Sequence, residues 1–141
     1  MGKRPVVVRK ETLGFIGNRL QFALLREALS LVERGVATPE DIDTVVRASF
    51  GRRLPVTGLF RTADLAGLDV LHAICGVLFP DLAANAEPGP SMAELVAAGR
   101  LGTKTGAGWF TYTPQEAEAL RATLAKELIR RREADASEAV S

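Results

Sequence analysis

The sequence is poor in the residues that most often identify a chemistry. Its 141 residues include one histidine and one cysteine, His72 and Cys75, too few for an intrachain disulfide or a cluster of metal ligands. The two lie three positions apart in an apolar stretch, and we interpret both as structural residues. A single unpaired thiol is typical of a reducing compartment. The sequence therefore predicts a cytoplasmic protein without a metal site.

Long apolar runs and an excess of charge are also absent. No stretch approaches the ~20 apolar residues of a membrane span, and residues 1–11 contain no signal-peptide core. The formal net charge of +1 gives no indication of a nucleic-acid surface. Apolar residues make up 47% and charged residues 25%, a balance typical of globular proteins. We expect one globular domain that binds neither membrane nor nucleic acid.

A dinucleotide-binding fingerprint is the third absence. No Gly-x-Gly-x-x-Gly follows a strand, so the chain shows no Rossmann motif of its own. The β-branched run RPVVVRK at residues 4–10 predicts a single strand. A lone strand cannot satisfy its own backbone N–H and C=O groups, and no partner strand is apparent elsewhere. We expect this orphan strand to belong to a sheet outside the chain.

The remainder of the chain predicts helices with clear boundaries, and hence an all-α fold. Caps, prolines and glycines mark where these helices begin and end. The predicted boundaries are a first helix from Phe15 to Arg34 closed by Gly35, a second opened by Thr38-Pro39, a break near Gly67, capping boxes at Ser91 to Glu94 and at Thr113 to Glu116, and a polar tail at residues 134–141.

Two polar residues stand near the start of the first predicted helix, within TLGFIGNRLQFALL (residues 12–25). At about 100° per residue, Asn18 falls on the apolar face with Leu25 and Leu29, whereas Arg19 falls on the charged surface. An inward amide without a hydrogen bond costs about 1–3 kcal/mol. Asn18 therefore either has a structural role, capping backbone N–H groups or bonding a neighbouring loop, or bonds a ligand oxygen. The apolar arc is wide enough to need a cover on more than one side, such as a second copy of the chain.

Four blocks keep the order and spacing of a known family: GFIGNRL, EALSLVERGVATPEDID, ADLAGLD and RLGTKTGAGWFTY. Together they resemble the C-terminal domain of 3-hydroxyacyl-CoA dehydrogenases, including 3-hydroxybutyryl-CoA dehydrogenase. The resemblance covers residues 2–113 and implies a helical bundle of the 6-phosphogluconate dehydrogenase C-terminal-domain type at residues 14–133. Residues 1–13 would be the last strand and the linker of an absent Rossmann domain, which would account for the orphan strand.

The resemblance also implies a reaction, the NAD-dependent oxidation of L-3-hydroxyacyl-CoA to 3-ketoacyl-CoA or its reverse, in fatty acid metabolism. Asn18 matches the family's active-site asparagine near the 3-oxygen of the substrate, where a neutral amide can donate to a developing oxyanion. Lys104 matches the lysine of the KTG block, which reaches the bound dinucleotide. The catalytic histidine and its glutamate would belong to the absent domain, so we expect the chain alone to be inactive.

The partners that the resemblance implies are an acyl-CoA substrate, the Rossmann domain in cis or as a separate chain, and a second copy in a homodimer. Two other functions stay open. A dimerisation or acyl-CoA-binding module that acts alone would fit the absence of a cofactor domain, and a related hydroxy-acid dehydrogenase would share this helical half. Leu13, Leu59 and Arg61 replace the family's commoner proline, proline and glutamate, so the sequence does not define the acyl chain.

Overall fold

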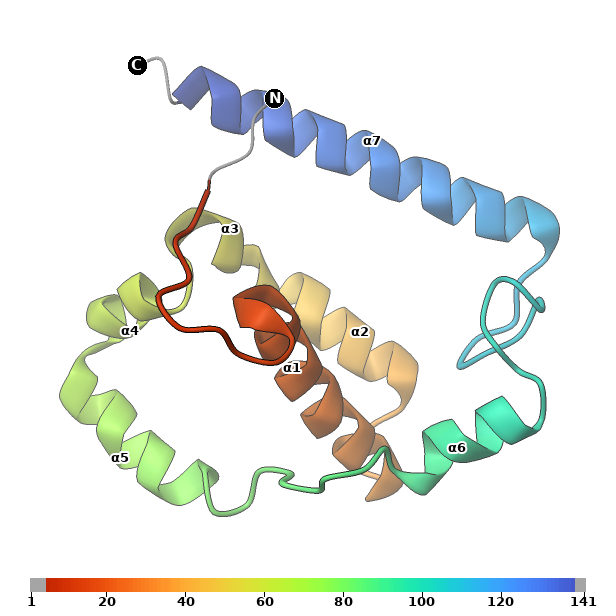
Figure 1. The fold of residues 1–141 in the computed structure, drawn as a ribbon, viewed down its shortest axis with the longest axis horizontal. Coiled ribbons are helices and arrows are strands. Elements are labelled where there is room, and N and C mark those ends of the chain that lie inside the picture. Colours follow the sequence, from red (N-terminus) through yellow and green to blue (C-terminus); the bar gives the residue numbers. More distant parts are fainter. Residues whose placement is uncertain (1–4, 139–141) are drawn as a thin grey trace. The chain divides into compact units, whose positions relative to one another are not determined.

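A computed structural model describes residues 5–138 as helices joined by loops (Figure 1). The all-α prediction is confirmed, since the only β-pairing in the described residues consists of isolated bridges from Ala107 to Gly102 and to Thr111. The elements are α1 (Phe15–Glu33), α2 (Pro39–Ala48), the 3-10 turn η1 (Phe50–Arg52), α3 (Leu54–Thr57), α4 (Phe60–Ala66), α5 (Leu68–Leu78), α6 (Pro90–Ala97) and α7 (Pro114–Glu138).

Residues 5–10 do not form the predicted orphan strand. A strand exists only as part of a hydrogen-bonded ladder, and residues 5–138 supply no second strand with which it could pair. Residue 4, where the predicted strand begins, lies outside the described residues. The origin of this segment in a sheet beyond the chain stays a prediction.

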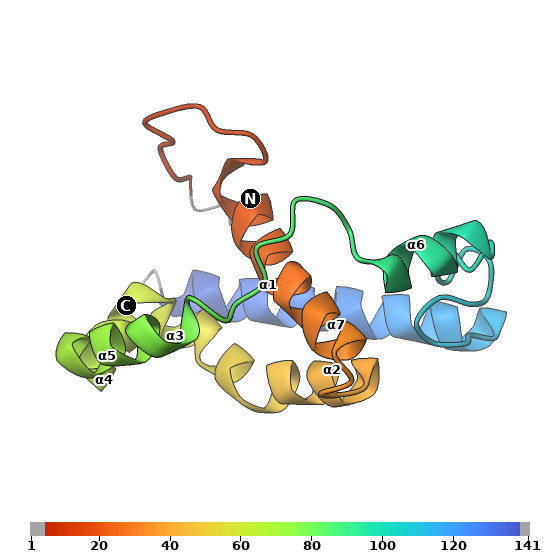
Figure 2. The same cartoon turned by 90° about the horizontal axis from the view of Figure 1, so that it is seen from below.

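The described chain divides into two compact units. The central unit holds residues 17–93, which include most of α1 together with α2 to α5 and the start of α6. The terminal unit holds the described residues up to 16 and from 94 onward, which include the rest of α6, a glycine-rich loop and α7. Figure 2 shows the same elements from a second side.

Predicted cap residues set several helix boundaries in the central unit. Gly35, with φ +68°, closes α1, and its N–H donates to the carbonyl of Val32 at 2.9 Å. The hydroxyl oxygen of Thr38 accepts the N–H of Asp41 at 3.2 Å, and the Asp41 carboxylate accepts the N–H of Thr38 at 3.2 Å. Gly67 separates α4 from α5, so this stretch forms two helices rather than one.

The predicted capping box at the start of α7 is also present. The N–H and hydroxyl of Thr113 donate to the Glu116 carboxylate at 2.8 and 2.9 Å, and the Thr113 hydroxyl accepts the N–H of Glu116 at 3.2 Å. The backbone and side-chain hydrogen bonds from Thr113 lower the pKa of Glu116 below its ordinary value. Both boxes supply partners for N–H groups that the first turn of a helix leaves unpaired. α7 then continues through residues 134–138, the described part of the predicted polar tail.

The predicted capping box at Ser91 and Glu94 is wrong. α6 begins at Pro90, and the N–H and hydroxyl of Ser91 donate to one carboxylate oxygen of Glu33 at 3.2 and 2.5 Å. A carboxylate from α1 thus satisfies a first-turn N–H group and lies where the helix dipole is positive. The spacing of Ser91 and Glu94 imitates a local cap, but the partner comes from 58 positions earlier.

The charged face of α1 binds the connector at residues 79–89, which crosses α1 in both Figure 1 and Figure 2. These contacts join residues that are distant in sequence, and all of them lie within the central unit. They are a hydrogen bond from the Ala83 N–H to Glu27 at 2.7 Å, one from Arg26 to the Asn85 carbonyl at 3.5 Å, and the ion pair of Arg34 with Asp81 at 3.4 Å.

The apolar face of α1 has no such cover. Leu20, Phe22 and Leu24 are 53%, 60% and 44% exposed. Within the central unit, the helices that contact one another are sequence neighbours between α2 and α5, and none of them packs against α1. The central unit therefore presents an uncovered apolar helix face.

Candidate functional site

Asn18 lies in the first turn of α1, directly after an unusual backbone turn. Gly14 and Phe15 both have positive φ, +79° and +49°, and the N–H of Phe15 donates to the carbonyl of Thr12 at 3.1 Å. A positive φ is uncommon for a residue with a side chain and costs on the order of 1 kcal/mol or more. This turn sets the point at which α1 begins, and hence the position of Asn18.

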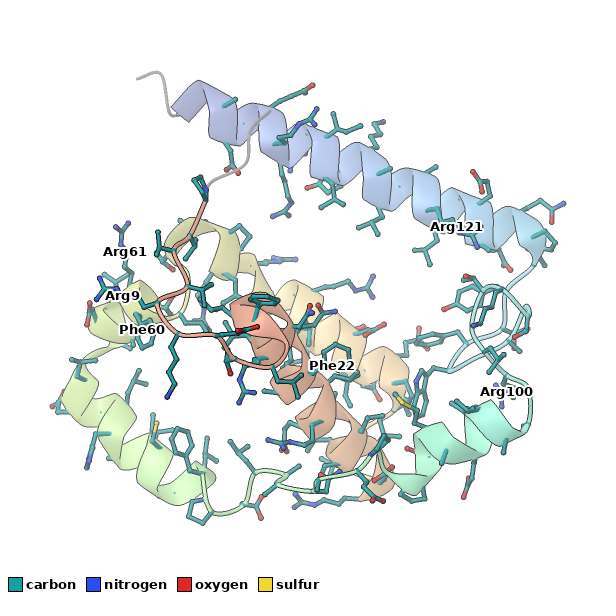
Figure 3. The ribbon with its side chains drawn as sticks, in the orientation of Figure 1. Arg9, Phe22, Phe60, Arg61, Arg100 and Arg121 are labelled. Atoms are coloured by element: carbon teal, nitrogen blue, oxygen red, sulfur yellow. The ribbon has the colours of Figure 1, made fainter. Side chains whose placement is uncertain are left out.

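The side chain of Asn18 is exposed and makes no hydrogen bond to any described residue. The capping interpretation of Asn18 is therefore wrong. The expectation that its amide points inward is also wrong for this chain, because the surrounding apolar face, including Phe22 in Figure 3, is itself exposed. Helical periodicity identifies the apolar face but not what covers it. The amide keeps two N–H donors and one carbonyl acceptor for a group outside the described residues. Arg19 is exposed, as predicted.

Lys104 lies in a tight turn of the glycine-rich loop. The turn runs from Gly102 to Thr105 and is closed by a hydrogen bond from the Thr105 N–H to the Gly102 carbonyl at 3.1 Å. The Thr105 hydroxyl accepts the N–H of Leu101 at 2.8 Å and donates to the carbonyl of Ala107 at 3.1 Å. Lys104 is exposed, and no carboxylate among the described residues pairs with it. Its ammonium group is available to an anion.

Further contacts hold this loop in one conformation. The guanidinium of Arg100 donates to the Gly108 carbonyl at 2.7 Å, and Arg121 of α7 donates to the hydroxyl of Thr103 at 3.2 Å (Figure 3). Gly108 packs so closely on Gly102 that a Cβ at position 108 would lie 2.8 Å from the Gly102 Cα. Only glycine fits there, and this close packing fixes the position of the backbone that carries Lys104.

The two candidate residues lie in different units, Asn18 in the central unit and Lys104 in the terminal unit. His72 is exposed on α5, and Cys75 is partly buried three residues later. Among the side chains that the structure describes, at residues 5–136, no three of His, Cys, Asp or Glu gather closely enough to hold a metal ion. No helix in the described part of the chain is both long and apolar enough to cross a membrane.

Two residues that build these sites were not predicted. Thr105 organises the loop around Lys104, and the signal for it is a hydroxyl residue beside glycine in a short turn, where such side chains commonly bond the backbone. Phe15 adopts the positive φ that precedes Asn18. Nothing in the sequence marks Phe15, because residues with large side chains avoid that conformation.

Comparison with known proteins gives this geometry a context. The family model described as 3-hydroxyacyl-CoA dehydrogenase, C-terminal domain, matches residues 14–112. The match begins at the turn that sets Asn18 and ends just after the glycine-rich loop that carries Lys104. It stops before α7.

Individual relatives match more of the chain than the family model does. A 5-formyl-3-hydroxy-2-methylpyridine 4-carboxylate 5-dehydrogenase from Mesorhizobium japonicum is 43% identical over 92% of this chain and 42% of its own length. The human mitochondrial hydroxyacyl-coenzyme A dehydrogenase is 41% identical over 79% of this chain and 35% of its own. A crystal structure described as the first of these enzymes, an NAD+ dependent dismutase, has a TM-score of 0.89 at 42% identity and covers 93% of this chain and 42% of that chain. This chain therefore spans less than half the length of these relatives.

Proposed function

Because the chain belongs to the 3-hydroxyacyl-CoA dehydrogenase C-terminal domain family, we propose that it is the substrate-facing half of an NAD-dependent dehydrogenase. In this proposal the complete enzyme oxidises L-3-hydroxyacyl-CoA to 3-ketoacyl-CoA, or runs in reverse. The relatives are dehydrogenases, which supports the reaction class. The observation that carries the proposal is the exposed amide of Asn18, which makes no hydrogen bond to the described residues.

The proposed role of Asn18 is to donate an N–H to the 3-oxygen of the substrate. Oxidation of the alcohol removes a hydride from C3 and a proton from the hydroxyl, so negative charge develops on that oxygen. An amide stabilises this charge by hydrogen bonding, and it stays neutral throughout because it does not titrate. We place the residues that take the proton outside this chain, in the part of the relatives that it does not cover.

Lys104 is the residue that we propose to contact the cofactor. When bound, a nicotinamide dinucleotide would supply the hydride acceptor for this reaction. The exposed ammonium of Lys104, unpaired with any described carboxylate and held on a rigid loop, is suited to a phosphate oxygen or a ribose hydroxyl. The residues present fit such a group, and no described cluster of ligands indicates a metal instead.

A second candidate function is the dehydrogenation of a small hydroxy acid that bears a free carboxylate rather than a thioester. The match to the pyridine carboxylate dehydrogenase favours it, because that match covers 92% of this chain and therefore includes most of α7. The human hydroxyacyl-coenzyme A dehydrogenase matches 79% of the chain. The two substrates differ in the CoA moiety, so activity with matched substrates separates them.

We also propose that the protein is a cytoplasmic homodimer. The exposed apolar face of α1, with Leu20, Phe22 and Leu24, supports pairing with a second copy. Complete burial of one large apolar side chain contributes about 1.5–3 kcal/mol, so covering such a face favours association. The single cysteine supports a reducing compartment. A dinucleotide-binding domain, in cis or as a separate chain, would complete the enzyme.

The test of the proposed function uses the protein joined to its dinucleotide-binding domain. We expect NADH oxidation with acetoacetyl-CoA, and we expect Asn18→Ala to lower kcat by about 100-fold, a typical loss for one oxyanion donor, at an unchanged melting temperature. Gln21→Ala, which removes another exposed amide of α1, is the control and should keep the rate.

Three results would contradict the proposal in different ways. A normal rate with a lower melting temperature in Asn18→Ala would make Asn18 a structural residue. Turnover of free hydroxy acids without turnover of acetoacetyl-CoA would support the second candidate. The third result would be acyl-CoA binding without turnover, by a chain whose gene neighbourhood encodes no dinucleotide-binding domain. It would indicate a binding module.

A further inference from the structure

α7 carries an apolar stripe that the terminal unit leaves uncovered. The helix is continuous from Pro114 to Glu138, as Figure 1 and Figure 2 show. Ala117 near its start is only 3% exposed, whereas Leu120, Leu124 and Leu128 are 54%, 59% and 58% exposed. At about 100° per residue, positions four apart advance by about 40°, so the three leucines share one side of the helix. No other helix of the terminal unit packs against them in the described residues.

The charges of α7 are distributed unevenly around this leucine stripe. Carboxylates stand near the start of the helix, at Glu116 and Glu118, and a run of guanidinium groups, Arg130 to Arg132, follows near its end. Leu124 lies midway between the two groups in sequence. Arg130 and Arg131 both bond Glu127, at 2.7–2.8 Å, whereas Arg132 pairs with no described carboxylate. The leucine stripe is therefore flanked by carboxylates on its N-terminal side and by the arginine run on its C-terminal side, and Glu133 and Asp135 follow the arginines.

We propose that the leucine stripe of α7 binds α7 of a second copy in an antiparallel pair, with Leu124 facing Leu124 of the second copy. In this alignment Leu120 faces Leu128 of the second copy, and Glu116 and Glu118 of each helix lie beside the run Arg130 to Arg132 of the other. A parallel pair would bring the two arginine runs together, which repels. Charge complementarity thus selects a second copy, and it selects the antiparallel direction.

The flanks of the stripe support the same alignment. On a helical wheel, Glu118 and Arg132 fall on one flank of the leucines, and Glu116 and Arg130 fall on the other. In an antiparallel pair, residues on the same flank of the two helices meet. Each flank then places a carboxylate of one copy beside a guanidinium of the other. The ion pairs within α7 are exposed, so the same side chains can also contact the second copy.

The contact is short, because Leu120 and Leu128 are about 12 Å apart along the helix axis at 1.5 Å per residue. It therefore adds to a dimer that other surfaces also hold, and in this respect it rests on the proposed homodimer. It is separate from the apolar face of α1, since it uses different residues. α7 lies outside residues 14–112, the region that the family model matches.

Disulfide trapping tests the alignment in the 141-residue chain with Cys75→Ser. We expect Leu124→Cys to form a disulfide-linked dimer on mild oxidation. Leu120→Cys and Leu128→Cys should each stay unlinked, because identical positions would be about 12 Å apart, beyond the ~7 Å Cα separation that a disulfide tolerates. A mixture of these two variants should form a linked heterodimer. Ala122→Cys, on the opposite side of α7, is the control and should not link.

Charge reversal provides an independent readout. Arg132→Glu should lower the linking yield of Leu124→Cys about two- to fivefold, the factor that corresponds to an exposed ion pair, and Glu118→Arg in the same chain should restore it. Equal linking of Leu120→Cys with itself would overturn the antiparallel alignment. No linking at position 124 in a chain that light scattering shows to be dimeric would overturn the α7 pair while leaving the proposed homodimer intact. A monomer would overturn both.

Discussion

One carboxylate oxygen of Glu33 accepts two hydrogen bonds from Ser91, one from its N–H and one from its hydroxyl. Glu33 is the last residue of α1, and Ser91 stands in the first turn of α6. The contact attaches the far end of the connector at residues 79–89 to α1, and it places a negative charge at the positive end of a helix dipole. It is the basis of the first two predictions.

Removing this contact should destabilise the protein. We expect Glu33→Gln and Ser91→Ala each to lower the free energy of unfolding by about 0.5–1.5 kcal/mol, because the first removes the charge of the acceptor and the second removes the hydroxyl donor. Urea denaturation followed by circular dichroism measures the change. Asp81→Asn, which removes the largely exposed ion pair with Arg34 on the same connector, is the control and should change stability by about 0.5 kcal/mol or less. Equal losses of stability in all three variants would show that the Glu33–Ser91 contact stabilises the protein no more than the exposed ion pair does.

A side chain at Gly89 should displace the Glu33 carboxylate. It is buried, and a Cβ at this position would collide with the Glu33 carboxylate. We expect Gly89→Ala to lower the free energy of unfolding by about 0.5–1.5 kcal/mol, because the displaced Glu33 carboxylate loses its hydrogen bonds to Ser91. The matched control is Gly76→Ala in α5, where a Cβ would meet open space and alanine is the better helix former, so a gain of about 0.5–1 kcal/mol is expected. In thermal denaturation, the melting temperature should fall for Gly89→Ala and rise for Gly76→Ala.

The helicity of α7 should depend on pH through Glu127. Hydrogen bonds from Arg130, and then from Arg131, lower the pKa of Glu127 from 4.5 to about 2. Because the pKa is lower in the helix than in the unfolded chain, the stabilisation is complete above pH 4.5 and is lost as the pH falls toward 2.

We therefore expect the far-ultraviolet circular dichroism of the chain to lose helix signal between these two pH values. Glu127→Gln should have less helix at pH 7 and a smaller loss on acidification. Glu133→Gln is the control, because Glu133 forms no ion pair among the described residues, and its titration should follow the unchanged protein. An identical titration in Glu127→Gln would show that these hydrogen bonds do not stabilise α7.

Lys104 should affect cofactor binding without affecting folding. In the protein joined to its dinucleotide-binding domain, we expect Lys104→Ala to raise the Kd for NADH about tenfold or more, because a hydrogen bond to a charged group contributes about 1.5–3 kcal/mol. Lys126→Ala, which removes an exposed ammonium group from α7, is the control. Isothermal titration and a thermal melt of each variant separate binding from stability. An unchanged Kd would remove Lys104 from the proposed cofactor site.

Local chemistry made the helix boundaries predictable, because a cap and its partner lie within a few residues of each other. Thr38 with Asp41 and Thr113 with Glu116 have one geometry in almost any protein, so sequence spacing suffices. Ser91 shows the limit. The same spacing to Glu94 is present, but the Glu33 carboxylate competes for the same N–H group, and its approach depends on the tertiary structure.

The candidate site was predictable to a similar degree. Residue patterns identified Asn18 and Lys104, but not the positive φ of Phe15 or the Thr105 hydroxyl that position them. Periodicity also predicted an inward Asn18, whereas its side chain is exposed. A hydrophobic pattern reports which face of a helix prefers to be covered, and the cover itself can come from another domain or another chain.

The contacts of α1 with the connector also determine how the central unit should fold in time. The helices from α2 to α5 contact only their sequence neighbours, and such local contacts form quickly. The contacts that α1 and Arg34 make with the connector and with Ser91 span 47 to 59 positions, so each must first overcome the entropy of closing a long loop. We therefore expect the connector to dock late in refolding, after the local helices have formed, and amide exchange in residues 81–91 to report the slowest step of this unit.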